Sequence, residues 1–293
     1  MLTSEKTIEK QQISIVIPAY NEESRIGTVL DDLLTKVNLR NIDYEIIVVD
    51  DGSQDKTAEI VKKHNVKLIQ QEHNKGYGAA IKMGVYYAQY NIIVITDADG
   101  TYPVDQISGL IDFIKDYDMV VGARTGDQIK IPLIRRPAKW ILNKYANFLV
   151  KEKIPDLNSG LRVFRKDVFE KFRRLLPNGF SLTTTITLAL LSNGYRIKYS
   201  PINYFKRGAE KSKFKPIRDT ISFFSLITRT SLYFKPLRVY MPIALFLLGL
   251  GTILLIYDLF MGNISDKTMM VFLWGIQLGI LGLLADAISR KNE

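Results

Sequence analysis

Two long apolar runs near the C-terminus constrain this chain more than any other feature. Residues 239–257 form a run of 19 without a charge, and residues 268–285 form another of 18. At 1.5 Å per helical residue, each run approaches the roughly 30 Å thickness of a bilayer's hydrocarbon core. The alternative is a pair of buried core helices, but both runs are apolar on all faces and only a short linker, residues 258–267, joins them. We therefore expect a transmembrane hairpin.

The charges beside these runs indicate how the hairpin is oriented. The formal net charge is +10, and the segment from Lys206 to Arg238 carries nine basic residues against two acidic ones. Arg290 and Lys291 follow the second run, whereas the linker holds a single Lys. The positive-inside rule places the N-terminal two hundred residues and both termini in the cytoplasm, at the cell membrane or an endomembrane. The basic belt suits lipid head groups and phosphates, and because no nucleic-acid-binding motif accompanies it, we expect no nucleic acid partner.

Cysteine and histidine usage excludes several classes of protein. The chain has no Cys and only two His, without H-E-x-x-H spacing. Disulfide frameworks, thiolate metal sites, Cys nucleophiles and zinc hydrolases are therefore not expected. The first twelve residues are charged and lack an apolar stretch, so no secretory signal is expected.

The first two hundred residues alternate short β-rich runs with segments of helical periodicity. This order predicts an α/β fold whose parallel sheet is covered on both faces. The expected strands are residues 13–17, 45–49, 66–70, 91–96 and 119–122. Two aromatic and basic segments, residues 132–150 and 217–234, are predicted to lie in the head-group plane as amphipathic helices. Ordinary core packing is the alternative, and it is equally plausible for the first segment.

Three expected strands end in polar residues, and ligands of parallel α/β sheets bind beyond such ends. These ends are Pro18-Ala-Tyr-Asn-Glu-Glu23, Asp50-Asp-Gly-Ser-Gln-Asp55 and Asp97-Ala-Asp99. Each alone could be a turn or a helix cap. Because residues i and i+2 of a strand face the same way, Asp97 and Asp99 are expected to share one Mg²⁺ or Mn²⁺ that bridges a diphosphate.

These blocks resemble the family 2 inverting glycosyltransferases of GT-A fold, and among them the polyprenyl-phosphate (dolichyl-phosphate type) hexose synthases. The resemblance covers roughly residues 12–215 and also includes Asn74-Lys-Gly-Tyr-Gly-Ala-Ala80, Val121-Gly-Ala-Arg124 and Asn158-Ser-Gly-Leu-Arg162. It implies a GT-A domain over residues 1–205. A basic loop and juxtamembrane helix would follow over 206–236, and two spans over 237–288, at about 239–259 and 268–287.

The resemblance also implies roles for individual residues. Asp97 and Asp99 would bind the metal, with Thr101 as a weak third contact where many relatives have Gln. Arg124 would lie where sugar donor and acceptor phosphate meet, and Arg136 and Lys139 are candidates for the lipid phosphate. The residues expected to bind the nucleotide are Pro18, Tyr20, Glu22, Val49, Asp51 and Ala98, together with Arg207 and Lys213 of a basic loop. For these last two, membrane-surface charge is the alternative.

One departure from the family pattern bears on the acceptor. Relatives that glycosylate hydroxyl groups carry an acidic base, whereas residues 180–188 contain no carboxylate. A hydroxyl must lose a proton as it attacks, but a phosphate monoester with a second pKa near ~6 is already ionised at pH 7. A cationic site without a base therefore favours a lipid phosphate as acceptor.

The sequence thus predicts an inverting transferase that moves a hexose from a GDP- or UDP-sugar to dolichyl or undecaprenyl phosphate. The alternatives are a polysaccharide synthase, whose Gln-x-x-Arg-Trp block and further spans are not found, and a non-catalytic membrane scaffold that retains the fold. The Gly275-Ile-Gln-Leu-Gly279 segment permits close helix contact, either with a second copy of the chain or within the hairpin.

Overall fold

The computed structural model describes residues 11–36, 42–125, 136–205 and 216–291. By their contacts the residues divide into two compact units. The first comprises Met1–Leu133, Ile154–Leu190 and Tyr195–Phe214, and the second comprises Ile134–Lys153, Leu191–Gly194 and Lys215–Glu293. We describe each unit by itself.

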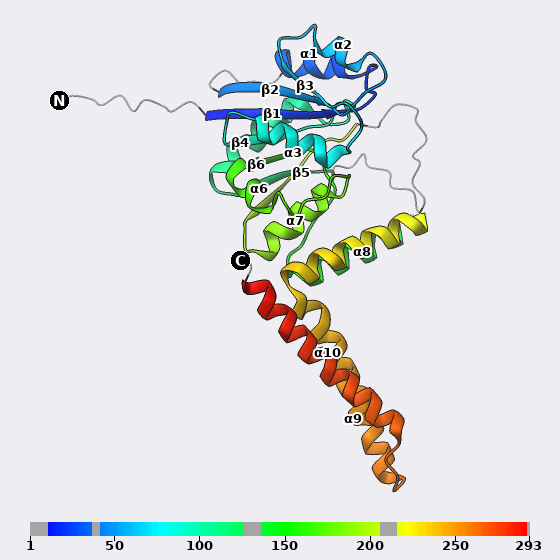
Figure 1. The fold of residues 1–293 in the computed structure, drawn as a ribbon. Coiled ribbons are helices and arrows are strands. Elements are labelled where there is room, and N and C mark those ends of the chain that lie inside the picture. Colours follow the sequence, from blue (N-terminus) through cyan, green and yellow to red (C-terminus); the bar gives the residue numbers. More distant parts are fainter. Residues whose placement is uncertain (1–10, 37–41, 126–135, 206–215, 292–293) are drawn as a thin grey trace, which may run out of the picture. The chain divides into compact units, whose positions relative to one another are not determined.

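The first unit is built on a seven-stranded sheet with the order β3-β2-β1-β4-β6-β5-β7 (Figure 1). Strands β1, β2, β3 and β4 run parallel to one another, and β7 runs parallel to β5. Strand β6 is antiparallel to both β4 and β5. The strands are β1 (Gln11–Ala19), β2 (Ile42–Asp50), β3 (Lys67–Gln70), β4 (Ile92–Ile95), β5 (Met119–Ala123), β6 (Arg162–Arg165) and β7 (Ile197–Pro201).

Helices of this unit alternate with the strands, which confirms the predicted α/β fold. The five predicted strands are present, whereas β6 and β7 were not anticipated. The helices are α1 (Ile26–Lys36), α2 (Thr57–Val61), α3 (Tyr77–Tyr87), α4 (Ile107–Ile111), α6 (Lys166–Phe172) and α7 (Leu182–Ser192), with 3₁₀ turns η1 (Val104–Gln106) and η2 (Asp112–Lys115).

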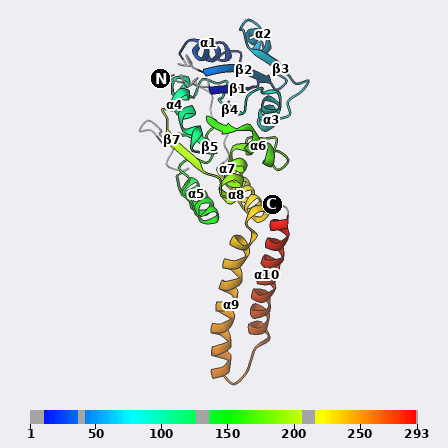
Figure 2. The ribbon, with the colours of Figure 1, turned by 90° about the vertical axis from the view of Figure 1, so that its left-hand side faces the viewer.

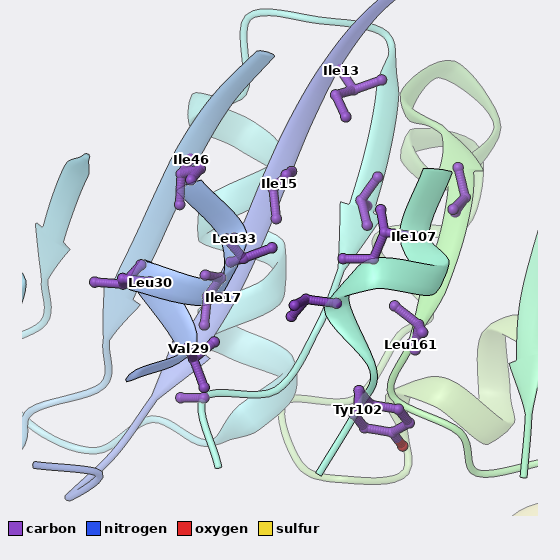
Figure 3. Close-up of a cluster of buried hydrophobic side chains, with 14 of the residues drawn as sticks. Ile13, Ile15, Ile17, Val29, Leu30, Leu33, Ile46, Tyr102, Ile107 and Leu161 are labelled. Atoms are coloured by element: carbon purple, nitrogen blue, oxygen red, sulfur yellow. The ribbon is translucent and has the colours of Figure 1, made fainter. Parts of the chain in front are cut away.

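Both faces of the central strands are buried, as expected for a parallel sheet. Ile15 and Ile17 of β1 belong to one core cluster with Leu30 and Leu33 of α1 (Figure 3). Tyr102 lies in the same cluster. On the opposite face α3 approaches β1 and β2 closely, because Gly84 has no side chain and an added Cβ would meet Val16 of β1 and lie 3.2 Å from Val49 Cγ2 of β2.

The second unit contains α5 (Arg136–Val150), α8 (Pro216–Phe234), α9 (Pro236–Phe260) and α10 (Asp266–Lys291). Tyr145 of α5 stacks on Phe224 of α8, with ring centroids 4.6 Å apart, and its hydroxyl lies 2.8 Å from Thr228 Oγ1. Helix α5 therefore packs with the C-terminal helices, although the predicted boundary placed it in the domain of residues 1–205. That boundary stays a prediction.

Helices α9 and α10 form an antiparallel hairpin (Figure 2). Pro236–Phe260 and Asp266–Ser289 are long and apolar enough to cross a membrane, with mean hydropathies of 2.4 and 1.9. In the most apolar 18-residue stretch of each helix, only 11% and 17% of the stretch is buried. Core helices of a soluble protein are mostly buried, so these values argue against that alternative. Asp258 closes the turn between them by accepting hydrogen bonds from Ser265 N (2.8 Å) and Thr268 Oγ1 (2.7 Å).

Gly275 and Gly279 of the expected contact segment differ in how closely they approach α9. A Cβ on Gly275 would lie 2.8 Å from Leu248 Cγ of α9, so this glycine permits close packing within one hairpin. Gly279 has more room, since its nearest contact would be Ala244 Cβ at 3.9 Å. Assembly with a second copy stays a prediction.

Candidate active site

The candidate site is the edge of the sheet where β1, β2 and β4 end. Because these strands are parallel, the segments that follow them emerge at the same edge. Strand β6 runs the other way, and its first residue, Arg162, pairs with Ile95 of β4 and Val121 of β5. The loop before β6 therefore reaches this edge as well, and it brings Asp156 and Gly160 there.

Hydrogen bonds join the segments after β1 and β2. The backbone N–H of Asn21 donates to Ser53 Oγ (2.9 Å), and Asn21 Oδ1 accepts from the N–H of Gln54 (2.8 Å). Asn21 has a φ of 55°, a left-handed conformation that Asn tolerates. Among the predicted nucleotide-binding residues nearby, Pro18 and Val49 are buried, Tyr20 is exposed, and the N–H of Glu22 donates to Thr57 Oγ1 (2.9 Å).

Asp51 holds a loop in place. Its two carboxylate oxygens accept hydrogen bonds from the backbone N–H groups of Lys75 and Gly76, both at 2.9 Å, and the residue is 3% exposed. The adjacent Gly52 has a φ of 75°, and a Cβ there would lie 2.7 Å from the carbonyl carbon of His73. Asp51 thus ties the end of β2 to the loop before α3, and its role in nucleotide binding stays a prediction.

Asp97 and Asp99 lie beyond β4, not on it. Because β4 ends at Ile95, the expected alternation of strand faces does not place these carboxylates, and that reasoning was wrong. Asp99 instead lies in a turn, where its Oδ1 accepts hydrogen bonds from Thr101 N (3.0 Å) and Thr101 Oγ1 (2.7 Å). Thr101, predicted as a third metal contact, is buried and orients Asp99. Ala98, which lies between Asp97 and Asp99 in the sequence, is buried.

Tyr77, at the start of α3, supports Asp97. Its hydroxyl donates to Asp97 Oδ1 at 2.9 Å, and its ring stacks on Phe180 with centroids 5.2 Å apart. Burial, with the negative charge of Asp97, raises the pKa of Tyr77 well above its ordinary value. Tyr77 therefore stays protonated and serves as a permanent hydrogen-bond donor.

The loop before β6 presses directly against Asp97. A Cβ on Gly160 would lie 2.7 Å from Asp97 Oδ2 and 2.8 Å from Oδ1, so only glycine leaves room for this carboxylate. The N–H of Gly160 donates to Tyr102 Oη at 2.6 Å. Two parts of the chain, around residues 97–102 and 156–160, are thereby joined at the site.

Arg124 forms a bidentate ion pair with Asp156. Arg124 Nε lies 2.7 Å from Asp156 Oδ2 and Nη2 lies 2.9 Å from Oδ1, and the Arg124 backbone N–H also donates to Oδ2. Burial opposes both charges, but the pair outweighs it: the pKa of Asp156 is lowered and that of Arg124 is raised. The guanidinium also lies over the ring of Tyr204, 5.3 Å from its centroid.

Sequence reasoning missed Asp156 and the support behind it. Arg162 is fully buried and its guanidinium donates to the carbonyls of Leu157 and Ser159 and to Thr187 Oγ1, at 2.7–3.0 Å. Thr184 Oγ1 donates to Asn158 Oδ1 at 2.5 Å. The signal available in the sequence was the Asn158-Ser-Gly-Leu-Arg162 block. This block belongs to the family resemblance, but no role was predicted for its residues.

The remaining predicted residues fall outside what the structure describes. Arg207 and Lys213 belong to residues 206–215, which are not described. Arg136 and Lys139 lie in the first two turns of α5, and their side chains are not described.

The residues at the edge suit a hard divalent cation. Asp97 and Asp99 supply carboxylate oxygens, which Mg²⁺ and Mn²⁺ prefer. Within the described ranges no group of three or more His, Cys, Asp or Glu side chains is placed to hold a metal. Two carboxylates leave coordination positions for diphosphate oxygens and water, as is usual for Mg²⁺ bound with a phosphate substrate.

Family comparisons agree with this arrangement. Residues 14–173 match the family described as glycosyl transferase family 2, and residues 235–290 match the GtrB C-terminal hairpin. The first match spans the sheet edge described above, and the second spans α9 and α10.

Relatives with dolichyl-phosphate transferase names share much of the chain. A dolichyl-phosphate hexose transferase of Haloferax volcanii is 33% identical over 200 residues, which are 68% of this chain and 85% of the relative. A dolichol-phosphate mannosyltransferase of Pyrococcus furiosus is 30% identical over 221 residues, 70% of this chain and 59% of the relative.

Solved structures show the same fold at lower identity. Glucosyl-3-phosphoglycerate synthase from Mycobacterium tuberculosis, in complex with Mn²⁺, UDP and glucosyl-3-phosphoglycerate, has a TM-score of 0.56 at 19% identity. The alignment covers 76% of this chain and 79% of that one. The chain is therefore a glycosyltransferase of family 2 that carries a GtrB-type C-terminal hairpin.

Proposed function

We propose that this glycosyltransferase moves a hexose from a GDP- or UDP-sugar to a polyprenyl phosphate such as dolichyl or undecaprenyl phosphate, with inversion at the anomeric carbon. The observation that carries the proposal is the carboxylate pair Asp97 and Asp99 beyond β4, at the edge where β1 and β2 also end. The names of the relatives from Haloferax and Pyrococcus support a dolichyl-phosphate acceptor.

The donor would bind across the ends of β1, β2 and β4. Pro18, Tyr20, Glu22, Val49 and Asp51 would hold the base and ribose, with Ala98 beside the nucleotide. Asp97 and Asp99, with Thr101 orienting the latter, would hold Mg²⁺ or Mn²⁺, which when bound neutralises charge on the leaving diphosphate. The Mn²⁺ and UDP found with the mycobacterial synthase support a divalent metal.

The acceptor phosphate would be the nucleophile. One of its oxygens forms a bond to the anomeric carbon, the bond from that carbon to the diphosphate breaks, and the electron pair leaves with the nucleoside diphosphate. No proton has to be removed, because the phosphate is already ionised near pH 7. Asp156 is a carboxylate at this edge, but its ion pair with Arg124 lowers its pKa and makes it a weak base.

Cationic residues would hold the two phosphate groups against their mutual repulsion. Arg124, Arg136 and Lys139 would contact the acceptor phosphate, and Arg207 and Lys213 the donor diphosphate. The hairpin would anchor the enzyme in the membrane that contains the lipid acceptor, with both termini in the cytoplasm.

Transfer of labelled hexose from GDP- and UDP-sugars to dolichyl or undecaprenyl phosphate tests the proposal. Activity should disappear with EDTA and return with Mn²⁺ or Mg²⁺, and Asp99→Asn should abolish it. Asp112→Asn is a matched control, because Asp112 is an exposed carboxylate on η2. Full activity of Asp99→Asn, or transfer of sugar to an alcohol instead of a phosphate, would refute the proposal.

A further inference from the structure

A pocket lies on the face of the first unit that carries α3 and α6. Its volume is about 780 Å³, within the roughly 300–1,000 Å³ usual for small-molecule sites. It is bounded by residues of α3, by the end of α6 with the residues that follow it, and by Gln71 and Lys75 of the loop after β3. The pocket borders the candidate active site at Lys75, whose backbone N–H donates to Asp51, but none of the predicted nucleotide, metal or acceptor residues lines it.

Gln71 is the most informative residue of this pocket. It is 7% exposed, yet neither Nε2 nor Oε1 of its side chain forms a hydrogen bond with the described residues. Its backbone is fixed, because the Gln71 N–H donates to Asp50 O at 2.9 Å. An unpaired buried amide costs about 1–3 kcal/mol, so a ligand with both a donor and an acceptor would satisfy it.

The pocket is also strongly cationic. Lys75, Lys82, Arg173 and Arg174 line it together with a single carboxylate, Glu170. Glu170 Oε2 lies 3.6 Å from Arg173 Nη1, and Lys82 Nζ donates to Leu176 O and Asn178 Oδ1. The side chains of Lys75 and Arg174, by contrast, form no ion pair or hydrogen bond within the described ranges. Positive charge is thus available for an anion.

We propose that this pocket binds a phosphate monoester carried on a polyhydroxy group, such as a sugar phosphate. The phosphate oxygens would accept hydrogen bonds from Lys75, Arg173 and Arg174, since guanidinium groups pair well with phosphate. Hydroxyls next to the phosphate would donate to Gln71 Oε1 and accept from Gln71 Nε2. An inorganic anion alone has fewer hydrogen-bond donors, so it would satisfy Gln71 Oε1 less well. The lining side chains differ from those proposed to hold the donor and the acceptor, so this proposal does not rest on the proposed function.

Titration calorimetry on the full-length protein in detergent tests this site, with glucose 6-phosphate as the probe and no added metal. The double variant Arg173→Ala/Arg174→Ala should weaken binding by about tenfold or more. Lys62→Ala/Lys63→Ala is the matched control, because it removes the same charge from two exposed residues beside α2 that do not line the pocket. Nanodiscs containing phosphatidylinositol 4-phosphate form a second arm, which separates a lipid head group from a soluble ligand.

Gln71→Leu tests the amide independently of charge. It should weaken binding of glucose 6-phosphate about fivefold and leave binding of inorganic phosphate nearly unchanged. The proposal is overturned if neither arm shows binding, if the control double variant loses as much as Arg173→Ala/Arg174→Ala, or if a nucleoside diphosphate with Mn²⁺ displaces the probe competitively. Because nucleotide binding is measured separately, failure here leaves the proposed transferase function untouched.

Discussion

At the scale of single residues, the candidate site is set by what orients its carboxylates. Tyr77 donates to Asp97, Thr101 donates to Asp99, and Arg124 neutralises Asp156. Each acidic side chain therefore has a specific partner from another position, and this partner limits where the charge can lie. Pre-organised charges of this kind lose little energy to rearrangement when a substrate binds.

Tyr77→Phe removes only the hydroxyl that bonds to Asp97 and keeps the ring that stacks on Phe180. A hydrogen bond to a charged group contributes about 1.5–3 kcal/mol, so we expect the metal concentration for half-maximal activity to rise roughly tenfold or more. Metal titration of transferase activity measures this shift. Tyr44→Phe, on β2 and partly exposed, is the control, and equal behaviour of the two variants would contradict the role of Tyr77.

Asp156→Asn should destabilise the first unit, because it leaves Arg124 without its anionic partner. The side chain of Asp156 is 4% exposed but that of Arg124 is 25% exposed, so we expect about 3 kcal/mol, at the lower end for broken buried pairs. Thermal melting in detergent measures the loss. Asp167→Asn breaks a half-exposed pair with Arg165 and should cost less than about 1 kcal/mol.

The same pair predicts a pH dependence. The folded-state pKa of Asp156 lies below its unfolded value of about 3.9, so its stabilising contribution is present above that pH and is lost as the pH falls through the folded pKa. The difference in melting temperature between the parent protein and Asp156→Asn should stay constant from about pH 5 to 8 and shrink below about pH 4. A difference that instead changes near pH 7 would show that another group is responsible.

At the scale of elements, strand β6 decides how the site is assembled. It pairs antiparallel with both β4 and β5, so its preceding loop arrives at the edge where those strands end. Buried Arg162 holds the carbonyls of that loop, and Gly160 lies against Asp97. A strand of only four residues thus places a loop that contributes Asp156 and confines the Asp97 carboxylate.

Gly160→Ala should displace the Asp97 carboxylate, because the new Cβ would lie 2.7 Å from Oδ2. Misplacement of a catalytic group by about 1 Å can cost on the order of a hundredfold in rate, and we expect a loss of that size in kcat. Gly109→Ala is the control, since a Cβ on this α4 glycine meets nothing within 4 Å. Transferase assays that found both variants equally active would show that Asp97 is free to move.

At the scale of the whole molecule, a family 2 catalytic unit is joined to a hairpin that is apolar enough to lie in a membrane. The proposed lipid phosphate acceptor would remain at the membrane surface, so an enzyme anchored there would meet a higher local concentration of it. This advantage follows from restricting both partners to one surface and needs no additional contact.

The proposed orientation can be tested by labelling, because the chain contains no Cys. With both termini in the cytoplasm, Asn263→Cys in the linker between α9 and α10 should react with a membrane-impermeant maleimide. The reagent is applied to intact membranes from the side opposite the cytoplasm. Lys62→Cys, exposed next to α2, should react only after permeabilisation. The reverse pattern would invert the orientation derived from the basic residues.

The sequence alone determined the α/β class, the two long apolar C-terminal helices and the position of the Asp97 and Asp99 block after a strand. These features depend on local patterns: continuous apolar runs identify strands buried on both faces and spans of bilayer length. Tertiary structure decided the antiparallel pairing of β6, the partnership of Asp156 with Arg124 and the approach of Gly160 to Asp97. Arg124 and Asp156 are 32 positions apart, Asp97 and Gly160 are 63 apart, and the paired residues Ile92 and Arg165 are 73 apart. Periodicity along the chain carries no information about such distant partners.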